Sequence, residues 1–178
     1  MKLTEAVDIL QAFEEQGRCV YRSRDLKKVF RDSTQSGFRS TLKRLQNTGK
    51  LTQACRDVYV FRKGRAKRAH LLEEIAATVR RGDVCYVSLE SALAEHGLIS
   101  QIPVNRLTVM TDGRTSEIAT PFGVIEFTHS ARSTFDLLTR SANVGRPLRL
   151  ATAKSALADL RRVGRNLHLV DEHFDAAL

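Results

Sequence analysis

The segment "TQSGFRSTLKRLQNTGKLTQACRDVYVF", residues 34–61, changes its hydrophobic period at a single glycine. Before Gly49, apolar residues recur at spacings of three and four, which is typical of an amphipathic helix. After it, apolar and polar residues alternate around Arg56-Asp57, which is typical of two short strands in a hairpin. Arg-Asp is a poor two-residue turn, so we expect the hairpin tip to be longer or irregular. A helix followed at once by a hairpin restricts the start of this chain to few folds.

Two further helices are predicted upstream. The first, over 3–17, has an apolar stripe and a stop at Gly17, and the second, over 23–30, has Ser23 as a candidate N-cap residue. The apolar residues 19–21 between them are expected to form a link. Three helices followed by a hairpin predict a winged helix-turn-helix over residues 1–65.

The third helix is expected to have one apolar and one polar face. Phe38, Leu42 and Leu45 would point inward, and Ser33 or Thr34 would cap the helix. Such a helix fits the major groove of DNA, where Arg39 can donate two bonds to guanine and Gln35 can pair with adenine. Flanking cations would contact phosphates, and Arg56 would lie at the wing tip. The predicted DNA-binding residues are Arg22, Arg24, Lys27, Thr34, Gln35, Ser36, Arg39, Ser40, Lys43, Lys50 and Arg56.

Charge is unevenly distributed along the chain. The net charge is +9, and residues 1–65 hold 15 Lys/Arg against 7 Asp/Glu, whereas residues 66–178 hold 14 against 13. A basic segment of this kind is typical of proteins that bind a polyanion, most often nucleic acid. A winged helix can also be a protein-docking module, and that alternative stays open.

Residues 66–178 predict a second domain. Helices are expected over 69–82, 88–97 and 152–164, and strands at "LTVMT", "SEIAT" and "VIEFTH", with turns at Asp112-Gly113 and at Pro121–Gly123. Residues 134–140 could be helix or strand. The predicted fold class is therefore α+β: an N-terminal winged helix-turn-helix followed by a small mixed α/β domain with an antiparallel sheet.

Candidate catalytic residues in this second domain are sparse. The five histidines have no metal-binding spacing, and Glu126 and His129 would point to opposite faces of a strand. Asp112 and Glu126 suggest a metal-dependent nuclease, but the sequence "IEFTH" lacks the lysine that usually follows such carboxylates. Cys85 lies among apolar residues, which favours a buried thiol. We therefore expect no enzyme, no cofactor and no metal; a nucleic-acid-processing enzyme targeted by the winged helix is the alternative.

The helix over 152–163 carries Lys154, Arg161, Arg162 and Arg165. This basic face could be a second nucleic-acid contact, a partner surface or a solvated face. Asp159 and the near-neutral charge of the domain favour the solvated face.

The chain carries no sign of export or membrane insertion. No apolar run approaches the roughly 20 residues that span a bilayer, and the first residues carry acids at helical spacing, unlike a signal peptide. Cys19, Cys55 and Cys85 are scattered and odd in number, which argues against a disulfide framework. We expect a cytoplasmic protein with no membrane partner.

Three motifs in order resemble the AbiEi family of antitoxins and transcriptional regulators from bacterial type IV toxin–antitoxin and abortive-infection systems. They are the "YVSLESALAEHGLI" helix, the "TPFGVIEF" hairpin and the "LATAKSALADL" helix. The resemblance covers nearly the whole chain, although the long C-terminal extension of larger members has no counterpart here.

The resemblance implies a function for each domain. The winged helix would repress its own operon by binding promoter repeats in double-stranded DNA. The C-terminal domain would counter a toxin, a nucleotidyltransferase, without a stable complex between the two proteins. The family offers no catalytic residues.

Overall fold

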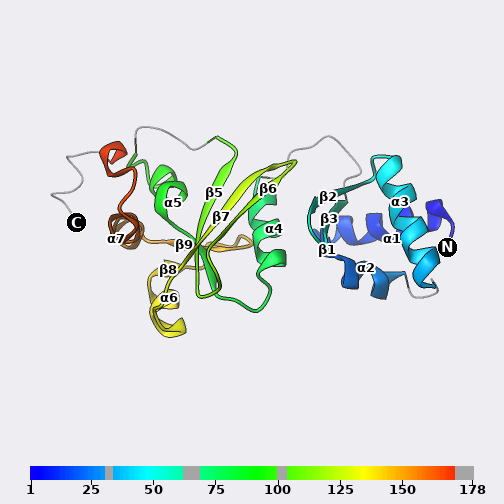
Figure 1. Ribbon diagram of the computed structural model, residues 1–178, viewed down its shortest axis with the longest axis horizontal. Helices are drawn as coiled ribbons and strands as arrows, with labels where there is room; N and C mark the ends of the chain where they lie inside the picture. The colour runs from blue at the N-terminus through cyan, green and yellow to red at the C-terminus, as the bar shows by residue number, and fades with distance from the viewer. Residues whose placement is uncertain (31–33, 62–68, 100–103, 171–178) are drawn as a thin grey trace. The chain divides into compact units, whose positions relative to one another are not determined.

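The structure is a computed structural model that describes residues 1–30, 34–61, 69–99 and 104–170 (Figure 1). It has an α+β fold and divides into two compact units, Met1–Leu71 (unit 1) and Leu72–Leu178 (unit 2). The boundary predicted between residues 65 and 66 lies outside the described residues.

Unit 1 contains three helices: α1 (Leu3–Glu15), α2 (Ser23–Val29) and α3 (Gln35–Asn47). Each amphipathic pattern forms the helix that it predicts, because the apolar residues of one face can then be buried together. Ser23 is the first residue of α2, not its N-cap; the N-cap is Arg22, whose backbone N–H donates to Oδ2 of Asp25 at 3.3 Å. The helix start is thus satisfied in part by the Asp25 carboxylate and in part by the Asp57 carbonyl, which accepts from the Ser23 N–H at 3.0 Å.

A three-stranded antiparallel sheet completes unit 1. Its strands are β1 (Val20–Arg22), β2 (Leu51–Cys55) and β3 (Val58–Phe61), in the order β1-β3-β2. Residues 19–21 were expected to form a link, but Val20 and Tyr21 pair with β3 as a strand, which is too short to show a period in the sequence. The β2–β3 turn is irregular, as expected: the register shifts between Gln53 and Cys55, and Asp57 has a φ of 67°.

The core of unit 1 lies between the three helices and one face of the sheet. Phe30 and Phe38 bring α2 and α3 together, with ring centroids 6.3 Å apart. Tyr21 and Phe61 contribute from the sheet, and both are fully buried. The apolar face of α3 packs in this core, so the side chains on the opposite face of α3 are the ones that reach the solvent.

Unit 2 is built on a six-stranded mixed sheet. The order is β6-β7-β5-β4-β9-β8, for strands β4 (Cys85–Val87), β5 (Arg106–Thr111), β6 (Ser116–Thr120), β7 (Gly123–His129), β8 (Ser141–Ala142) and β9 (Arg149–Ala151). The predicted antiparallel sheet is wrong in part: β6 and β7 form the expected hairpin, but β5 lies parallel to β7 and β4 parallel to β9. The hairpin turn reverses the chain at the sheet edge, so β7 returns beside β5 in the same direction.

Helices cover both faces of this sheet. They are α4 (Leu71–Val79), α5 (Leu89–Glu95), α6 (Thr134–Thr139), α7 (Ala153–Val163) and the short 3-10 helix η1 (Leu167–Leu169). Figure 1 shows α4 on one side of β5 and β7, and α5 and α7 on the other. The prediction for α7 is confirmed at both ends, since the Thr152 hydroxyl accepts from the Ser155 N–H and Gly164 closes the helix with a φ of 74°. Residues 134–140, left open between helix and strand, form α6.

Among the described residues, no helix combines the length and the apolar character needed to cross a membrane.

Candidate nucleic-acid interface

The helix α3 presents two chemically distinct faces. Phe38, Leu42 and Leu45 are buried as predicted, and Thr41 is buried with them. The predicted base-reading positions are all exposed: Thr34, Gln35, Ser36, Arg39, Ser40 and Lys43. The exposed face therefore carries cations and hydrogen-bonding groups on a rigid helix, while the other face is fixed in the core.

The first residues of α3 are exposed and carry hydrogen-bonding groups. Thr34 is the N-cap, as predicted, and its hydroxyl accepts from the Gly37 N–H at 3.2 Å while lying 3.2 Å from the Ser36 hydroxyl. The first turn carries no acidic residue. Because helix N-termini have a partial positive charge, this end of α3 favours phosphate oxygens.

The predicted phosphate contacts on α2 differ in exposure. Arg24 and Lys27 are exposed, whereas Arg22 is half-buried at the junction of β1 and α2. Arg22 pairs with Val58 across the sheet, so it lies on the sheet face opposite Tyr21 and the helical core. Arg24 and Lys27 are therefore better placed to reach a polyanion than Arg22.

The remaining predicted contacts lie on and beside the hairpin. Arg56 is exposed at the β2–β3 turn, next to Asp57. Lys50 is half-buried between α3 and β2. The structure thus places one predicted cation at the hairpin tip and one at its base.

Charge is segregated within unit 1. The helix α1 carries acids and no Lys or Arg, whereas residues 18–57 hold eleven Lys/Arg and three Asp/Glu. Of these three acids, Asp25 is buried and lies 3.3 Å from the Arg18 guanidinium, and Asp32 lies outside the described residues. The part of unit 1 formed by α2, α3 and the hairpin is therefore strongly positive, which raises the local concentration of a polyanion.

One basic residue of α3 was missing from the predicted set. Arg44 is exposed in the last turn, where its guanidinium donates to the Met1 carbonyl at 3.1 Å and to the Thr41 hydroxyl at 3.1 Å. These bonds fasten the N-terminus to α3, so Arg44 has a structural role beside any role in binding. Thr41 lies three residues after Phe38 and four before Leu45, a spacing from which its burial could have been predicted.

The candidate nuclease carboxylates of unit 2 are not brought together. Glu126 pairs with Thr108 in the sheet, whereas Asp112 follows the end of β5, about 13 Å further along the strand direction. Each carboxylate has its own partner: Asp112 accepts from the Val84 N–H at 2.9 Å, and Glu126 pairs with Arg106 at 2.9 Å. No cluster of metal-binding side chains occurs within the described part of the chain.

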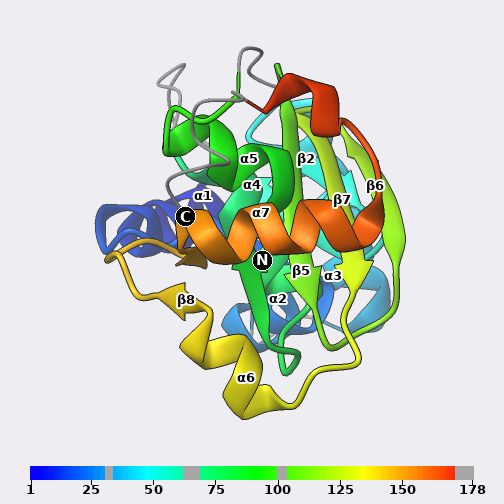
Figure 2. The same cartoon turned by 90° about the vertical axis from the view of Figure 1, so that its left-hand side faces the viewer.

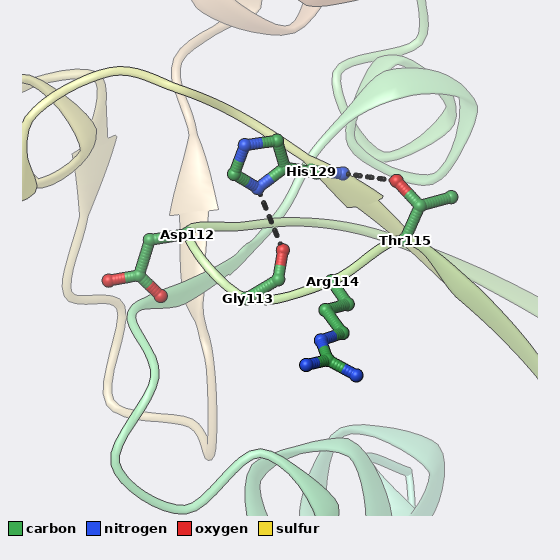
Figure 3. Close-up of a pocket in the computed structure, with 5 residues that line it drawn as sticks. All are labelled: Asp112, Gly113, Arg114, Thr115 and His129. Carbon is green, nitrogen blue, oxygen red and sulfur yellow. Dashed lines mark hydrogen bonds between the residues drawn. The ribbon is translucent and has the colours of Figure 1, made fainter.

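A shallow pocket lies where β5 and β7 end (Figure 3). It is lined by Asp112, Gly113, Arg114, Thr115 and His129. Nδ1 of His129 lies 2.8 Å from the Gly113 carbonyl, which only accepts, so this ring nitrogen donates. The His129 backbone N–H donates to the Thr115 hydroxyl at 3.0 Å. The visible role of His129 is to hold the loop between β5 and β6.

A buried carboxylate organises the other end of unit 2. Asp159 of α7 is fully buried, and its Oδ2 accepts from the hydroxyls of Tyr86 and Ser88, each at 2.9 Å. Its Oδ1 accepts from Arg132 at 2.7 Å and from Arg140 at 3.0 Å. Burial and the Asp159 charge raise the pKa of Tyr86 to about 12, which keeps the phenol a hydrogen-bond donor. We name these five residues the Asp159 cluster.

The basic residues predicted on α7 are exposed, as a solvated face requires, but Asp159 does not belong to that face. Asp159 was read as part of a solvated face, but it is the most deeply buried charge of the helix. Lys154 and Arg161 are exposed, Arg162 donates to the His129 carbonyl at 3.2 Å, and Arg165 pairs with Glu90 at 3.0 Å and with Glu126. Lys154, Arg161 and Arg162 are thus all exposed on α7, and Arg165 is half-buried beyond the end of the helix.

Cys85 is a buried thiol, as predicted. It lies 3.3 Å from the Thr111 hydroxyl, and burial raises its pKa. A raised pKa lowers the thiolate fraction, which makes Cys85 a poor nucleophile.

Comparison with known proteins identifies no family. No family profile matches the chain, and no curated protein matches it. One solved structure, the crystal structure of the RV2827C protein from Mycobacterium tuberculosis, is similar at 14% identity with a TM-score of 0.48. The match covers 68% of this chain and 44% of that protein, so the chain spans less than half of its length. A likeness this distant carries no information on function.

Proposed function

We propose that unit 1 is a winged helix-turn-helix that binds double-stranded DNA. The main support is that the two faces of α3 differ. Phe38 and Leu45 on one face are buried in the core, whereas Arg39 and the other predicted base-reading residues are exposed. The element order α1-β1-α2-α3-β2-β3 and the sheet order β1-β3-β2 support the proposal, because they put a short hairpin directly after the exposed helix. The concentration of positive charge on the same part of unit 1 is a second, independent support.

In this proposal the helix α3 enters the major groove by its N-terminal half. Arg39 would donate to guanine and Gln35 would pair with adenine, while Lys43 contacts the phosphate backbone at the groove edge. Arg56 at the hairpin tip would lie along the backbone or in the minor groove. Arg24, Lys27 and Lys50 would neutralise phosphates without reading sequence.

The salt dependence of binding tests the phosphate contacts. Binding of the full chain to a duplex from its own promoter is expected to weaken linearly in a plot of log K against log salt. Arg24→Ala and Lys27→Ala are each expected to reduce the slope by about one unit, because each removes one phosphate contact. Fluorescence anisotropy over a salt series measures the slope.

A cation of unit 2 supplies the matched control for this series. Lys154→Ala removes the same charge from an exposed position of α7 and is expected to leave the slope unchanged. Equal slopes for Arg24→Ala, Lys27→Ala and the natural sequence would contradict the placement of DNA beside α2. An effect of Lys154→Ala would instead show that unit 2 also contacts the DNA.

We also propose that the chain is an antitoxin and autorepressor of a type IV toxin–antitoxin system. The support is the resemblance of "YVSLESALAEHGLI", "TPFGVIEF" and "LATAKSALADL" to the AbiEi family, together with the proposed DNA-binding unit. The DNA would be promoter repeats of its own operon. The functional partner would be a nucleotidyltransferase toxin that forms no stable complex with the chain.

Co-expression tests the antitoxin role. A nucleotidyltransferase encoded beside this chain is expected to stop growth alone and to be tolerated when the chain is expressed from an unrelated promoter. A chain with both Arg39→Ala and Lys43→Ala is expected to lose repression and to keep protection, since neutralisation is assigned to unit 2. Growth arrest that persists with the natural chain would refute the antitoxin role, and co-purification of the toxin would refute the absence of a stable complex.

A further inference from the structure

The two edges of the unit 2 sheet differ in how they are protected. The β8 edge is two residues long, and the Ser141 carbonyl accepts from the Arg149 guanidinium. Short edge strands and occupied edge groups prevent pairing with another chain. The β8 edge is therefore closed to a further strand.

The β6 edge has none of these protections. β6 is five residues long and lies at the outer margin of the sheet (Figure 2), where β7 is its only strand neighbour among residues 1–30, 34–61, 69–99 and 104–170. It contains no Lys or Pro, the residues that commonly block edge pairing. Its one charge, on Glu117, is paired with Arg106 at 2.7 Å. Within the part of the chain that the structure describes, the outward backbone groups of β6 therefore have no strand partner, and no unpaired charge on β6 would repel another strand.

We propose that β6 pairs with β6 of a second copy of this chain, antiparallel about a twofold axis at Ile118. This register places Ile118 opposite Ile118, and Glu117 opposite Ala119 of the other copy. Ser116 then lies opposite Thr120, so no like charges face each other, and the strand is its own complement. Isologous contacts of this kind close with two copies, which selects a dimer over a filament.

The sheet then runs continuously through both copies. Pairing of five residues adds backbone hydrogen bonds but buries little side-chain area, which is typical of a reversible interface. The dimer therefore depends on protein concentration. It involves unit 2 alone and does not rest on the DNA-binding proposal, so all its tests are carried out without DNA.

Cysteine cross-linking tests the register directly. In a Cys55→Ser background, which removes the half-exposed native thiol, Ile118→Cys is expected to form an intermolecular disulfide under mild oxidation. Residues directly opposite in an antiparallel pair have Cα atoms about 4.5–5.5 Å apart, within the disulfide range. Thr120→Cys is the matched control, because its own copy would lie about 13 Å away. Equal cross-linking of the two variants overturns the register.

Two lysine variants test the interface without oxidation. Sedimentation of the natural chain is expected to show a monomer–dimer equilibrium. Ile118→Lys places two lysines opposite each other and is expected to give a monomer, whereas Ala119→Lys faces Glu117 of the second copy and is expected to keep the dimer. If Ile118→Lys fails to fold, the proposal is tested by the cross-linking of Ile118→Cys compared with that of Thr120→Cys. If the natural chain is monomeric at every concentration, the proposal is wrong, and β6 would then be available to pair with a strand of another protein.

Discussion

Replacing Arg39 and Lys43 by alanine together is expected to abolish sequence-specific DNA binding and to leave the fold intact. A bidentate arginine–guanine contact contributes about 1–3 kcal/mol of discrimination, and loss of Lys43 removes a phosphate contact. Together they are expected to weaken binding by about 100-fold or more, which is about 2.7 kcal/mol. Both side chains are exposed, so their truncation leaves the core of unit 1 unchanged.

A gel-shift with promoter DNA at moderate salt measures this effect. The matched control is a chain with Lys154→Ala and Arg161→Ala, which loses the same charge from exposed positions of α7. The control is expected to bind within about twofold of the natural chain. Unchanged affinity of the Arg39→Ala, Lys43→Ala chain would show that α3 does not read the DNA.

Replacing Asp159 by alanine is expected to destabilise unit 2 by about 3–5 kcal/mol, because it leaves partly buried guanidinium groups without their counter-ion. Arg132 and Arg140 are only 28% and 23% exposed, and both donate to the same carboxylate oxygen. The Tyr86 and Ser88 hydroxyls would also lose their acceptor. The loss far exceeds that of a surface ion pair, which contributes about 0–1 kcal/mol.

Urea denaturation followed by circular dichroism measures this loss. Glu117→Gln is the comparison, because it weakens the more exposed pair of Glu117 with Arg106 and is expected to cost under about 1 kcal/mol. If both variants shift the urea midpoint equally, the Asp159 cluster does not hold unit 2 together. If the two compact units unfold in separate transitions, the transition of unit 2 is identified as the one that Asp159→Ala shifts.

Helical periodicity predicted unit 1 because its helices are short-range features. The spacing of Phe38, Leu42 and Leu45 defined both faces of α3 before any tertiary contact was considered, and Thr34 was identified as its cap. β1 was missed because three residues are too few to show an alternating pattern. Its strand character comes from pairing with β3, which lies almost 40 residues away.

Unit 2 was harder to predict because its contacts are long-range. The strands β5, β6 and β7 were each recognisable from the sequence. Their order in the sheet depends on the path of the connections between strands, which local sequence patterns do not indicate. Asp159 is different, since it follows Ala156 by three residues and precedes Val163 by four and so falls on the inward stripe. Asp159 was nevertheless predicted to be solvated on account of its charge, because buried carboxylates are rare unless they are paired.

The bond between Tyr86 and Asp159 joins residues 73 positions apart, and β4 pairs with β9 across a similar separation. Structures of such high contact order form slowly, because a long loop must close before any of these contacts stabilise it. The internal contacts of unit 1 involve only the first 71 residues. During synthesis on the ribosome, unit 1 can therefore fold while β4 of unit 2 still lacks its neighbour β9. Strand edges that stay exposed during that interval favour aggregation.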